Sequence, residues 1–146
     1  MNDFEMIPHT ADLKLRVYGK SLPELFRNAL IGMFQSLKPV APDCSYQNGR
    51  LVCQALTIER PFGVDSPDQE ALLVDFLSQA LYLSDVHNEI YLDVEFSVFG
   101  PKDLVGVFKG VSITGMEESE IKAVTYHDLA IRQENGVWHT DIVFDI

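Results

Sequence analysis

The sequence has few cysteines, few basic residues and no long apolar run. Of its 146 residues, two are cysteine and 11 are Lys or Arg, against 22 Asp or Glu. No apolar run approaches the roughly 20 residues of a transmembrane helix, and the N-terminus MNDFEMIPHT lacks the basic-then-apolar plan of a signal peptide. With only Cys44 and Cys53 there is no disulfide framework, and a reducing cytosol fits best, although one Cys44–Cys53 bond stays open. We therefore expect a cytoplasmic protein that does not enter a membrane.

The net charge of −11 argues against nucleic acid as a direct partner. Proteins that bind nucleic acids on their own draw most of their affinity from Lys and Arg side chains that contact phosphates, and this chain has no basic cluster. We therefore expect no direct binding to RNA or DNA. A basic protein partner or bound cations fit the charge better, although acidity that serves only solubility is the simpler interpretation.

Motifs that would identify an enzyme are also absent. The chain contains no GxxxxGK[ST], no GxGxxG, no HExxH and no EF-hand loop. The two cysteines and four histidines lack the spacing of a zinc finger, and no nucleophile motif brings Ser, His and Asp together. His9 and His127 stand alone, and a lone histidine in a strand is more often structural than catalytic. The sequence by itself predicts no active site.

The composition is that of a globular protein, at 47% apolar and 23% charged residues, and the length predicts a single domain over residues 1–146. Two helices are predicted from apolar stripes at helical spacing, over residues 22–37 and 69–81. Ser21 with Glu24, and Ser66 with Gln69, have capping-box spacing at the two starts. Both helices therefore have a predicted start and one apolar face.

Most other segments alternate between apolar and polar residues, as half-buried strands do. Asn48-Gly49 and Asn135-Gly136 are typical of two-residue hairpin turns. In residues 90–99, Ile90, Val94 and Val98 are predicted to share one face. The predicted strands cover residues 11–20, 51–59, 90–99, 104–113, 122–133 and 137–146. Because strands come in runs late in the chain, we expect an α+β fold with a mainly antiparallel β-sheet and two helices packed on one face.

Carboxylates mark the ends of the first and last alternating strands. Asp12 begins the first strand on its polar face, and Asp145 ends the last strand beside the α-carboxylate of Ile146. First and last strands of a sheet are often neighbours, so the three carboxylates could converge and hold a hard divalent cation. The pattern alone favours three solvated surface charges. Phe144 and the Ile146 side chain are expected to hold this end of the chain in the core.

Four segments, in order, resemble the archease family: HTADLKLRVYGKSLPELFRNALIGMF, EALLVDFLSQALYL, IKAVTYHDLAI and the closing DI. The resemblance covers essentially the whole chain. Two departures from the family pattern are visible: Phe76 stands where many members have Trp, and Ser78-Gln79 where an acidic residue is common. Both departures lie in the second predicted helix, so they concern packing more than the carboxylates.

The resemblance implies an activator and not an enzyme. Archeases activate the RtcB-type tRNA-splicing RNA ligase, which uses divalent metals to attach guanylate from GTP to its own histidine before it joins RNA ends. The family's metal site corresponds to Asp12, Asp145 and Ile146 here, which implies a divalent ion such as Ca²⁺, Mg²⁺ or Mn²⁺. Lys122 matches a position tied to the family's activating role. Without the resemblance, Lys122 is a solvated strand lysine.

Two other classes of function stay open at this point. One is a small metal-dependent phosphoesterase or other hydrolase, with Asp12 and Asp145 as ligands and His127 or His9 as general base. The other is an acidic protein-interaction module that binds no metal. Hydrolysis assays on generic phosphate esters would identify the first, and calorimetric titration with Ca²⁺ and Mg²⁺ would separate the second from an archease.

Overall fold

The computed structural model describes residues 3–7, 12–118 and 120–146. The helices in these residues are α1 (Leu22–Ser36) and α2 (Gln69–His87). The strands are β1 (Phe4–Ile7), β2 (Leu13–Gly19), β3 (Pro39–Val40), β4 (Cys44–Gln47), β5 (Arg50–Cys53), β6 (Ile58–Asp65), β7 (Glu89–Phe99), β8 (Asp103–Ser112), β9 (Gly115–Met116), β10 (Ala123–Val124), β11 (Arg132–Glu134) and β12 (Val137–Asp145). Every strand pair formed by the described residues is antiparallel. The predicted α+β class with mainly antiparallel pairing is confirmed.

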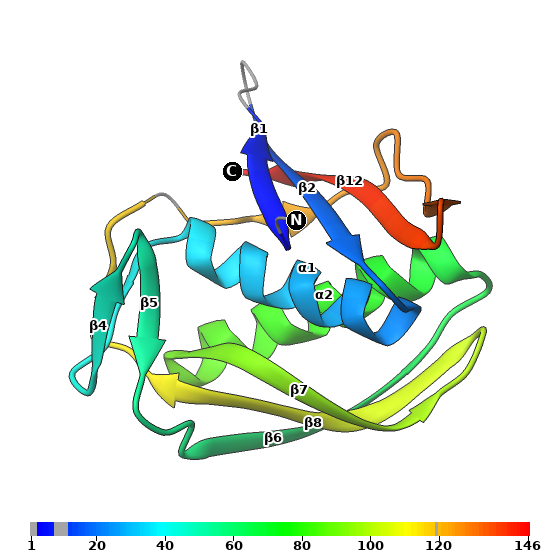
Figure 1. Cartoon of the computed structure of the whole chain (residues 1–146). Helices are drawn as coiled ribbons and strands as arrows, with labels where there is room; N and C mark the ends of the chain where they lie inside the picture. The colour runs from blue at the N-terminus through cyan, green and yellow to red at the C-terminus, as the bar shows by residue number, and fades with distance from the viewer. Residues whose placement is uncertain (1–2, 8–11, 119) are drawn as a thin grey trace.

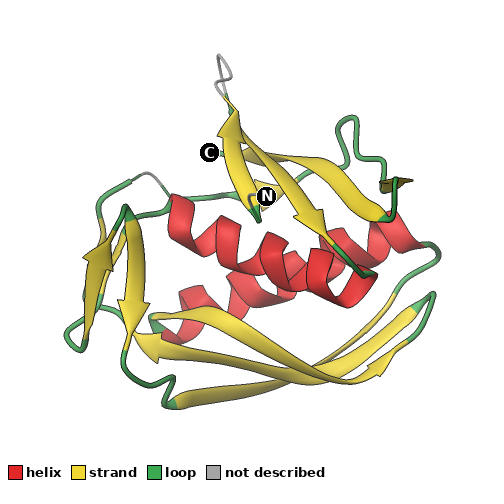
Figure 2. Cartoon of the chain, viewed as in Figure 1, coloured by secondary structure: helices red, strands yellow, loops and turns green. Residues whose placement is uncertain are grey.

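The helices form a middle layer between two sheets (Figure 1). Helix α1 packs on β1, β2 and β12 of one sheet and on β7 of the other, and α2 packs mainly on β6, β7 and β8. We call the sheet of β1, β2, β10, β11 and β12 the terminal sheet, because it contains strands from both ends of the chain. The other main sheet has the order β6-β8-β7 (Figure 2). The helices thus cover one face of each sheet, where the sequence suggested a single sheet.

In the terminal sheet the order is β1-β2-β12-β10, and β11 also pairs with β12. Strand β12 runs antiparallel to β2 from Trp138 opposite Gly19 to Phe144 opposite Leu13. The expectation that the first alternating strand and the last strand are neighbours is therefore confirmed. Their inward side chains, which include Leu15, Val17, Ile142 and Phe144, are fully buried.

A glycine lets this sheet lie close to α1. A Cβ atom on Gly32 would come within 2.8 Å of Phe4 Cγ and 2.9 Å of Leu15 Cδ2, shorter than van der Waals contact. The absence of a side chain at Gly32 therefore allows β1 and β2 to pack directly on the helix backbone.

The helix starts follow their capping residues, with one correction. Ser21 Oγ accepts a hydrogen bond from the Glu24 N–H at 3.2 Å, as predicted for α1. Helix α2 is capped instead by Asp68, whose Oδ1 accepts from the Ala71 N–H at 2.8 Å. The prediction that Ser66 caps this helix is therefore wrong. The Ser66 hydroxyl donates a hydrogen bond to Asp75 at 2.5 Å. Asp caps helices as well as Ser does, and Asp68 lies closer to the first apolar turn.

The two predicted hairpin turns are confirmed, whereas two long predicted strands are divided. Asn48-Gly49 and Asn135-Gly136 all have positive φ, as two-residue hairpin turns of this sequence require. The predicted strand 51–59 splits into β5 and β6, which belong to different sheets. The predicted strand 122–133 forms only β10 and β11, with residues 125–131 between them. Alternation of residue type cannot show where a chain leaves one sheet for another.

Aromatic rings fill the space between α2 and the β6-β8-β7 sheet. The Phe76 ring lies 5.6 Å from the Phe26, Phe62 and Phe96 rings and 5.4 Å from the Phe108 ring, measured between centroids. Phe76 is fully buried. It therefore joins α1, α2 and the sheet in one packed cluster.

The predicted face of β7 is wrong at its end. The register shifts between Phe96 and Val98, which breaks the two-residue period of the strand. Val98 is consequently 41% exposed, and Phe99 takes the inward place against Phe26, at a centroid distance of 5.1 Å.

Among the described residues, neither helix is long and apolar enough to cross a membrane.

Candidate functional site at the ends of β2 and β12

The structure brings the predicted site residues to one end of the terminal sheet. The pairing of β2 with β12 ends at Leu13 opposite Phe144. Asp12 directly precedes Leu13, and Asp145 directly follows Phe144. Residues opposite each other on antiparallel strands have Cα atoms about 5 Å apart. We call Asp12, Lys122, Asp145 and Ile146 the strand-end site.

Alternation along the strands predicts that both carboxylates lie on the outer face of the sheet, where Asp145 is exposed and Asp12 is half-buried. Farther along this face, Arg16 Nε donates to Asp141 Oδ1 at 2.8 Å, and Lys14 Nζ lies 3.6 Å from Asp141 Oδ2. The hydrogen bonds from Arg16 lower the pKa of Asp141. Asp145, by contrast, is exposed and makes no ion pair with a described residue. The outer face therefore has a neutralised carboxylate in its middle and an accessible one at its end.

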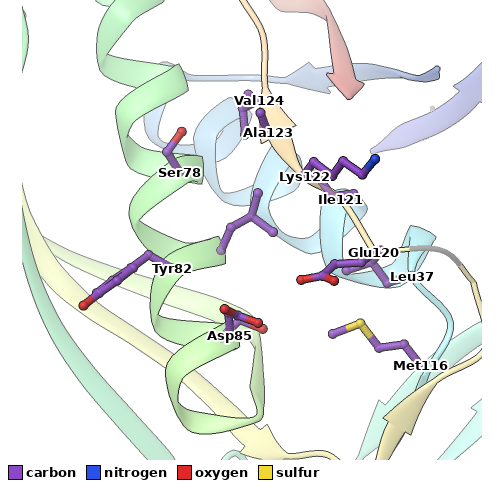
Figure 3. Close-up of a pocket in the computed structure, with 12 residues that line it drawn as sticks. Leu37, Ser78, Tyr82, Asp85, Met116, Glu120, Ile121, Lys122, Ala123 and Val124 are labelled. Atoms are coloured by element: carbon purple, nitrogen blue, oxygen red, sulfur yellow. The ribbon is translucent and has the colours of Figure 1, made fainter. Parts of the chain in front are cut away.

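Lys122 is fixed beside Asp145 through its backbone. The Lys122 N–H donates to the Asp145 carbonyl at 2.7 Å, and the next residue, Ala123, pairs with Asp145 across β10 and β12. The Lys122 side chain is exposed, and Figure 3 shows its ammonium directed away from α2. A cation directly before the short edge strand β10 thus lies next to the end of β12.

Ile146 does not enter the core. Phe144 is fully buried, as expected, but Ile146 is 41% exposed. With Phe4, Met6 and Leu13 it lines a cavity of about 370 Å³. The expectation that the Ile146 side chain is held in the core is wrong, because Ile146 lies at the wall of this open cavity, opposite Gln35 and Ser36 at the end of α1.

The groups at the strand-end site that could bind a metal ion are all carboxylate oxygens. Two aspartates and the α-carboxylate of Ile146 suit hard cations such as Ca²⁺ and Mg²⁺, which take carboxylate and carbonyl oxygens. Among the described residues, no group of three or more His, Cys, Asp or Glu side chains could hold a metal ion. The side chains of the described residues therefore form no complete set of ligands, and further oxygen ligands would be needed to hold an ion.

Of the two candidate general bases, the structure describes His127. His9 lies outside the described residues. His127 is exposed, with its Nε2 3.3 Å from Asp128 Oδ2. It follows β10, which runs from Ala123 opposite Asp145 to Val124 opposite Phe144 and so leads away from Asp145. The hydrolase alternative has no support.

Cys44 and Cys53 form a disulfide bond. They pair across the hairpin of β4 and β5, with Cα atoms 4.2 Å apart. The bond links two strands that the turn at Asn48-Gly49 already joins. Disulfides are rare in cytosolic proteins outside hyperthermophiles, so the bond does not itself support the cytoplasmic expectation.

Sequence reasoning missed one feature of this face. The ion pair between Arg16 and Asp141 was not foreseen, although each residue lies on the polar face of its strand. The sequence feature that indicates this pair is opposite charge at facing positions of two strands that are expected to be neighbours.

Comparison with known proteins gives a consistent result over the whole fold. The model of the Archease protein family (MTH1598/TM1083) matches residues 4–146. The archease of Methanosarcina mazei is 34% identical over 152 residues, which cover 98% of this chain and 95% of the relative. The archease of Pyrococcus furiosus is 29% identical over 154 residues that cover both chains fully.

Two solved structures have a similar fold. The solution structure of Methanobacterium thermoautotrophicum protein 1598 has a TM-score of 0.66 and 27% identity over the full length of both chains. A crystal structure from Thermotoga maritima, of an archease described as a possible chaperone, has a TM-score of 0.60 and 24% identity. It covers 96% of this chain and 94% of the other.

Proposed function

Because this chain belongs to the archease family, we propose that it is a non-catalytic, metal-binding activator of the RtcB-type tRNA-splicing RNA ligase. It promotes guanylylation of the ligase with GTP and the ligase's turnover. One observation carries the proposal: Asp12, Lys122 and Asp145 lie at one end of the terminal sheet. They come from three segments that are distant in sequence and are neighbours in the sheet. The description of the Thermotoga maritima relative as a possible chaperone fits a protein that acts on another protein.

In this proposal the strand-end site supplies oxygen ligands to a divalent ion. Asp12 and Asp145 provide side-chain carboxylates, and Ile146 provides its α-carboxylate. A bound divalent ion would neutralise charge on the triphosphate, which phosphoryl and nucleotidyl transfer require. Because the described side chains form no complete set of ligands, groups of the ligase would complete it when the two proteins meet.

Lys122 acts on the partner and not on the ion. An ammonium group cannot coordinate a cation, but it binds phosphate oxygens and carboxylates as a compact charge. Its backbone bond to Asp145 keeps it at the strand-end site. In the proposal this charge contacts a phosphate of GTP or a carboxylate of the ligase.

The partners follow from the charge and the site. A chain of net charge −11 approaches a basic surface readily, and the RNA is bound by the ligase. We therefore propose no direct contact with nucleic acid by this protein, and we place it in the cytoplasm with the ligase.

A guanylylation assay tests the proposal. The purified ligase is incubated with labelled GTP and a divalent metal, with and without this protein, and the rate of label transfer to the ligase is measured. We expect a faster rate and a larger number of turnovers with the protein present. An unchanged rate at saturating protein would contradict the proposed function.

Lys122→Ala should lose activation without loss of ion binding. The side chain is exposed, so its truncation should change the free energy of unfolding by about 0.5 kcal/mol or less. The control is Lys102→Ala, which removes another exposed lysine, in the turn between β7 and β8. Guanylylation rates and calorimetric Ca²⁺ titrations are measured for both variants. Equal activation by the two variants would contradict a role of Lys122 in activation and would indicate a solvated surface lysine.

Adding residues after Ile146 should weaken ion binding. The extension moves the terminal carboxylate away from Asp145 but leaves the buried Phe144 in place. We therefore expect a thermal midpoint close to that of the unextended chain and Ca²⁺ affinity about tenfold or more lower, the scale on which changes near a metal site act. The control carries the same extension before Met1. If both proteins bind Ca²⁺ equally, the terminal carboxylate is not a ligand. If the unextended chain binds neither Ca²⁺ nor Mg²⁺, the metal-free interaction module is favoured.

A further inference from the structure

A cavity of about 510 Å³ lies between the C-terminal half of α2 and the segment that leads into β10 (Figure 3). We call it the α2 cavity. It does not include the carboxylates of the strand-end site, and Lys122 is common to both. Its size falls within the range of pockets that bind ligands and side chains, about 300–1,000 Å³. The lining residues that matter here are Leu37, Leu81, Tyr82, Asp85, Glu120 and Ile121.

Apolar side chains continue from the cavity onto the surface of α2. Leu37 and Ile121 are buried at its wall, whereas Tyr82 is 63% exposed. Val86, one helical turn after Tyr82, is 53% exposed. Exposed tyrosine beside an apolar hollow is typical of surfaces that bind proteins.

The charges at the α2 cavity are negative and face each other. Figure 3 shows the carboxylates of Asp85, on α2, and Glu120, on the opposite segment, directed toward the space between the two walls. Neither makes an ion pair with a described residue, in contrast to Glu118, whose Oε1 lies 3.0 Å from Lys38 Nζ. Lys122 is the basic residue among the described lining residues, and its ammonium points away from the cavity. An anionic ligand would therefore meet two carboxylates and no counter-charge.

We propose that the α2 cavity docks a segment of a partner protein in which arginine or lysine alternates with apolar residues. The apolar side chains enter between Leu81 and Ile121, and the cation is held between Asp85 and Glu120. The two carboxylates exclude nucleic acid by repulsion of its phosphates. Charge complementarity of this kind determines which partner binds and how fast.

The docked segment would also reach the strand-end site through the chain. Residues 120–124 form one wall of the α2 cavity, and the Lys122 N–H holds this segment to the Asp145 carbonyl at 2.7 Å. A partner bound in the cavity therefore lies against the segment that positions Lys122. This inference goes beyond the proposed function, since it concerns a second surface and requires no ion.

The test is an NMR titration of the ¹⁵N-labelled protein with capped peptides. One peptide alternates leucine and arginine, a second replaces leucine with glycine at the same charge, and a third replaces arginine with glutamate. We expect the leucine–arginine peptide to shift the amide signals of residues 78–86 and 120–124 and to bind about tenfold or more tightly than the other two. No ligase is present, so the result is independent of the guanylylation assay.

Charge reversal locates the binding. Asp85→Lys and Glu120→Lys should each weaken the leucine–arginine peptide about tenfold or more, because like charges then face each other. Tyr82→Ala tests the apolar contact without a change of charge and should also weaken binding. Glu59→Lys is the matched control, an exposed carboxylate of β6 in the other sheet, and should leave the affinity within about twofold.

Three results would overturn the proposal. The peptide could shift the signals of residues spread over the whole acidic surface. The glycine–arginine peptide could bind as tightly as the leucine–arginine peptide. Glu59→Lys could weaken binding as much as Asp85→Lys does. Each would show attraction to net charge and no docking at the α2 cavity. Thermal unfolding of every variant verifies that the fold is intact before affinities are compared.

Discussion

Asp145→Ala should lose most of the activation of the ligase while the protein stays folded. We expect the stimulated guanylylation rate to fall about tenfold or more, since even residues that only support metal ligands cost 10–100-fold when they are changed. Asp145 is exposed and lies at the last position of β12. Its truncation should therefore change the free energy of unfolding by about 0.5 kcal/mol or less.

The measurement combines three readouts on the same protein preparation. Guanylylation of the ligase with labelled GTP gives activation, calorimetric titration with Ca²⁺ gives ion affinity, and urea denaturation gives stability. Asp12→Ala should behave as Asp145→Ala does in the first two, because both carboxylates are proposed ligands of one ion. Removing either carboxylate should also reduce repulsion at the strand-end site when no ion is bound.

The matched control is Glu134→Ala. Glu134 is an exposed carboxylate of the same sheet, on β11 beside the opposite end of β12, with its Oε1 3.6 Å from His139 Nε2. The change removes the same charge and should leave activation near that of the unmodified protein. Full activation by folded Asp145→Ala would contradict the role proposed for the end of β12. Equal losses in Glu134→Ala would indicate that net charge alone matters.

Phe76→Ala should destabilise the protein far more than any of the surface substitutions. The ring is fully buried and contacts rings of α1, β6, β7 and β8 at 5.4–5.6 Å between centroids. Truncation of a buried phenylalanine leaves a cavity that neighbouring rings fill only in part, at a cost of about 3–5 kcal/mol. Urea denaturation measured by circular dichroism gives this difference in the free energy of unfolding.

Tyr82→Ala provides the control for Phe76→Ala. It removes an aromatic ring from the same helix, but one that is 63% exposed, so we expect a change of about 0.5 kcal/mol or less. Phe76→Leu should be destabilising by an intermediate amount, because leucine fills part of the space. A loss below about 1 kcal/mol in Phe76→Ala would show that the aromatic cluster repacks and does not hold the layers together.

The sequence by itself determined the local elements. Ser21 and Glu24 predicted the start of α1 because a cap needs only residues three positions apart. Asn48-Gly49 and Asn135-Gly136 predicted both hairpin turns, because few residues adopt positive φ without strain. The alternation around Leu15 and Val17 gave the correct buried face of β2. These features depend on neighbours in the chain, which the sequence shows directly.

The candidate site was found from the sequence in part. Strand alternation placed Asp12 and Asp145 on polar faces at strand ends, and the pairing of β2 with β12 brings them to the same end. The identification of these residues and of Lys122 as functional came from the resemblance to archeases, since isolated carboxylates have no distinctive pattern. Their roles stay a prediction until the activity and ion affinity of the alanine variants are measured.

Only the tertiary structure decided how the strands divide. The alternation that predicts a strand reports one buried face, and it is the same whichever sheet provides that face. The sequence could not show that helices α1 and α2 lie between two sheets, or that residues 51–59 leave β5 to join another sheet as β6. The α2 cavity likewise has walls more than 30 residues apart in the chain, at Asp85 and Glu120. Such contacts form between segments distant in sequence, so their physical cause is the packing of whole layers and not the preference of any one segment.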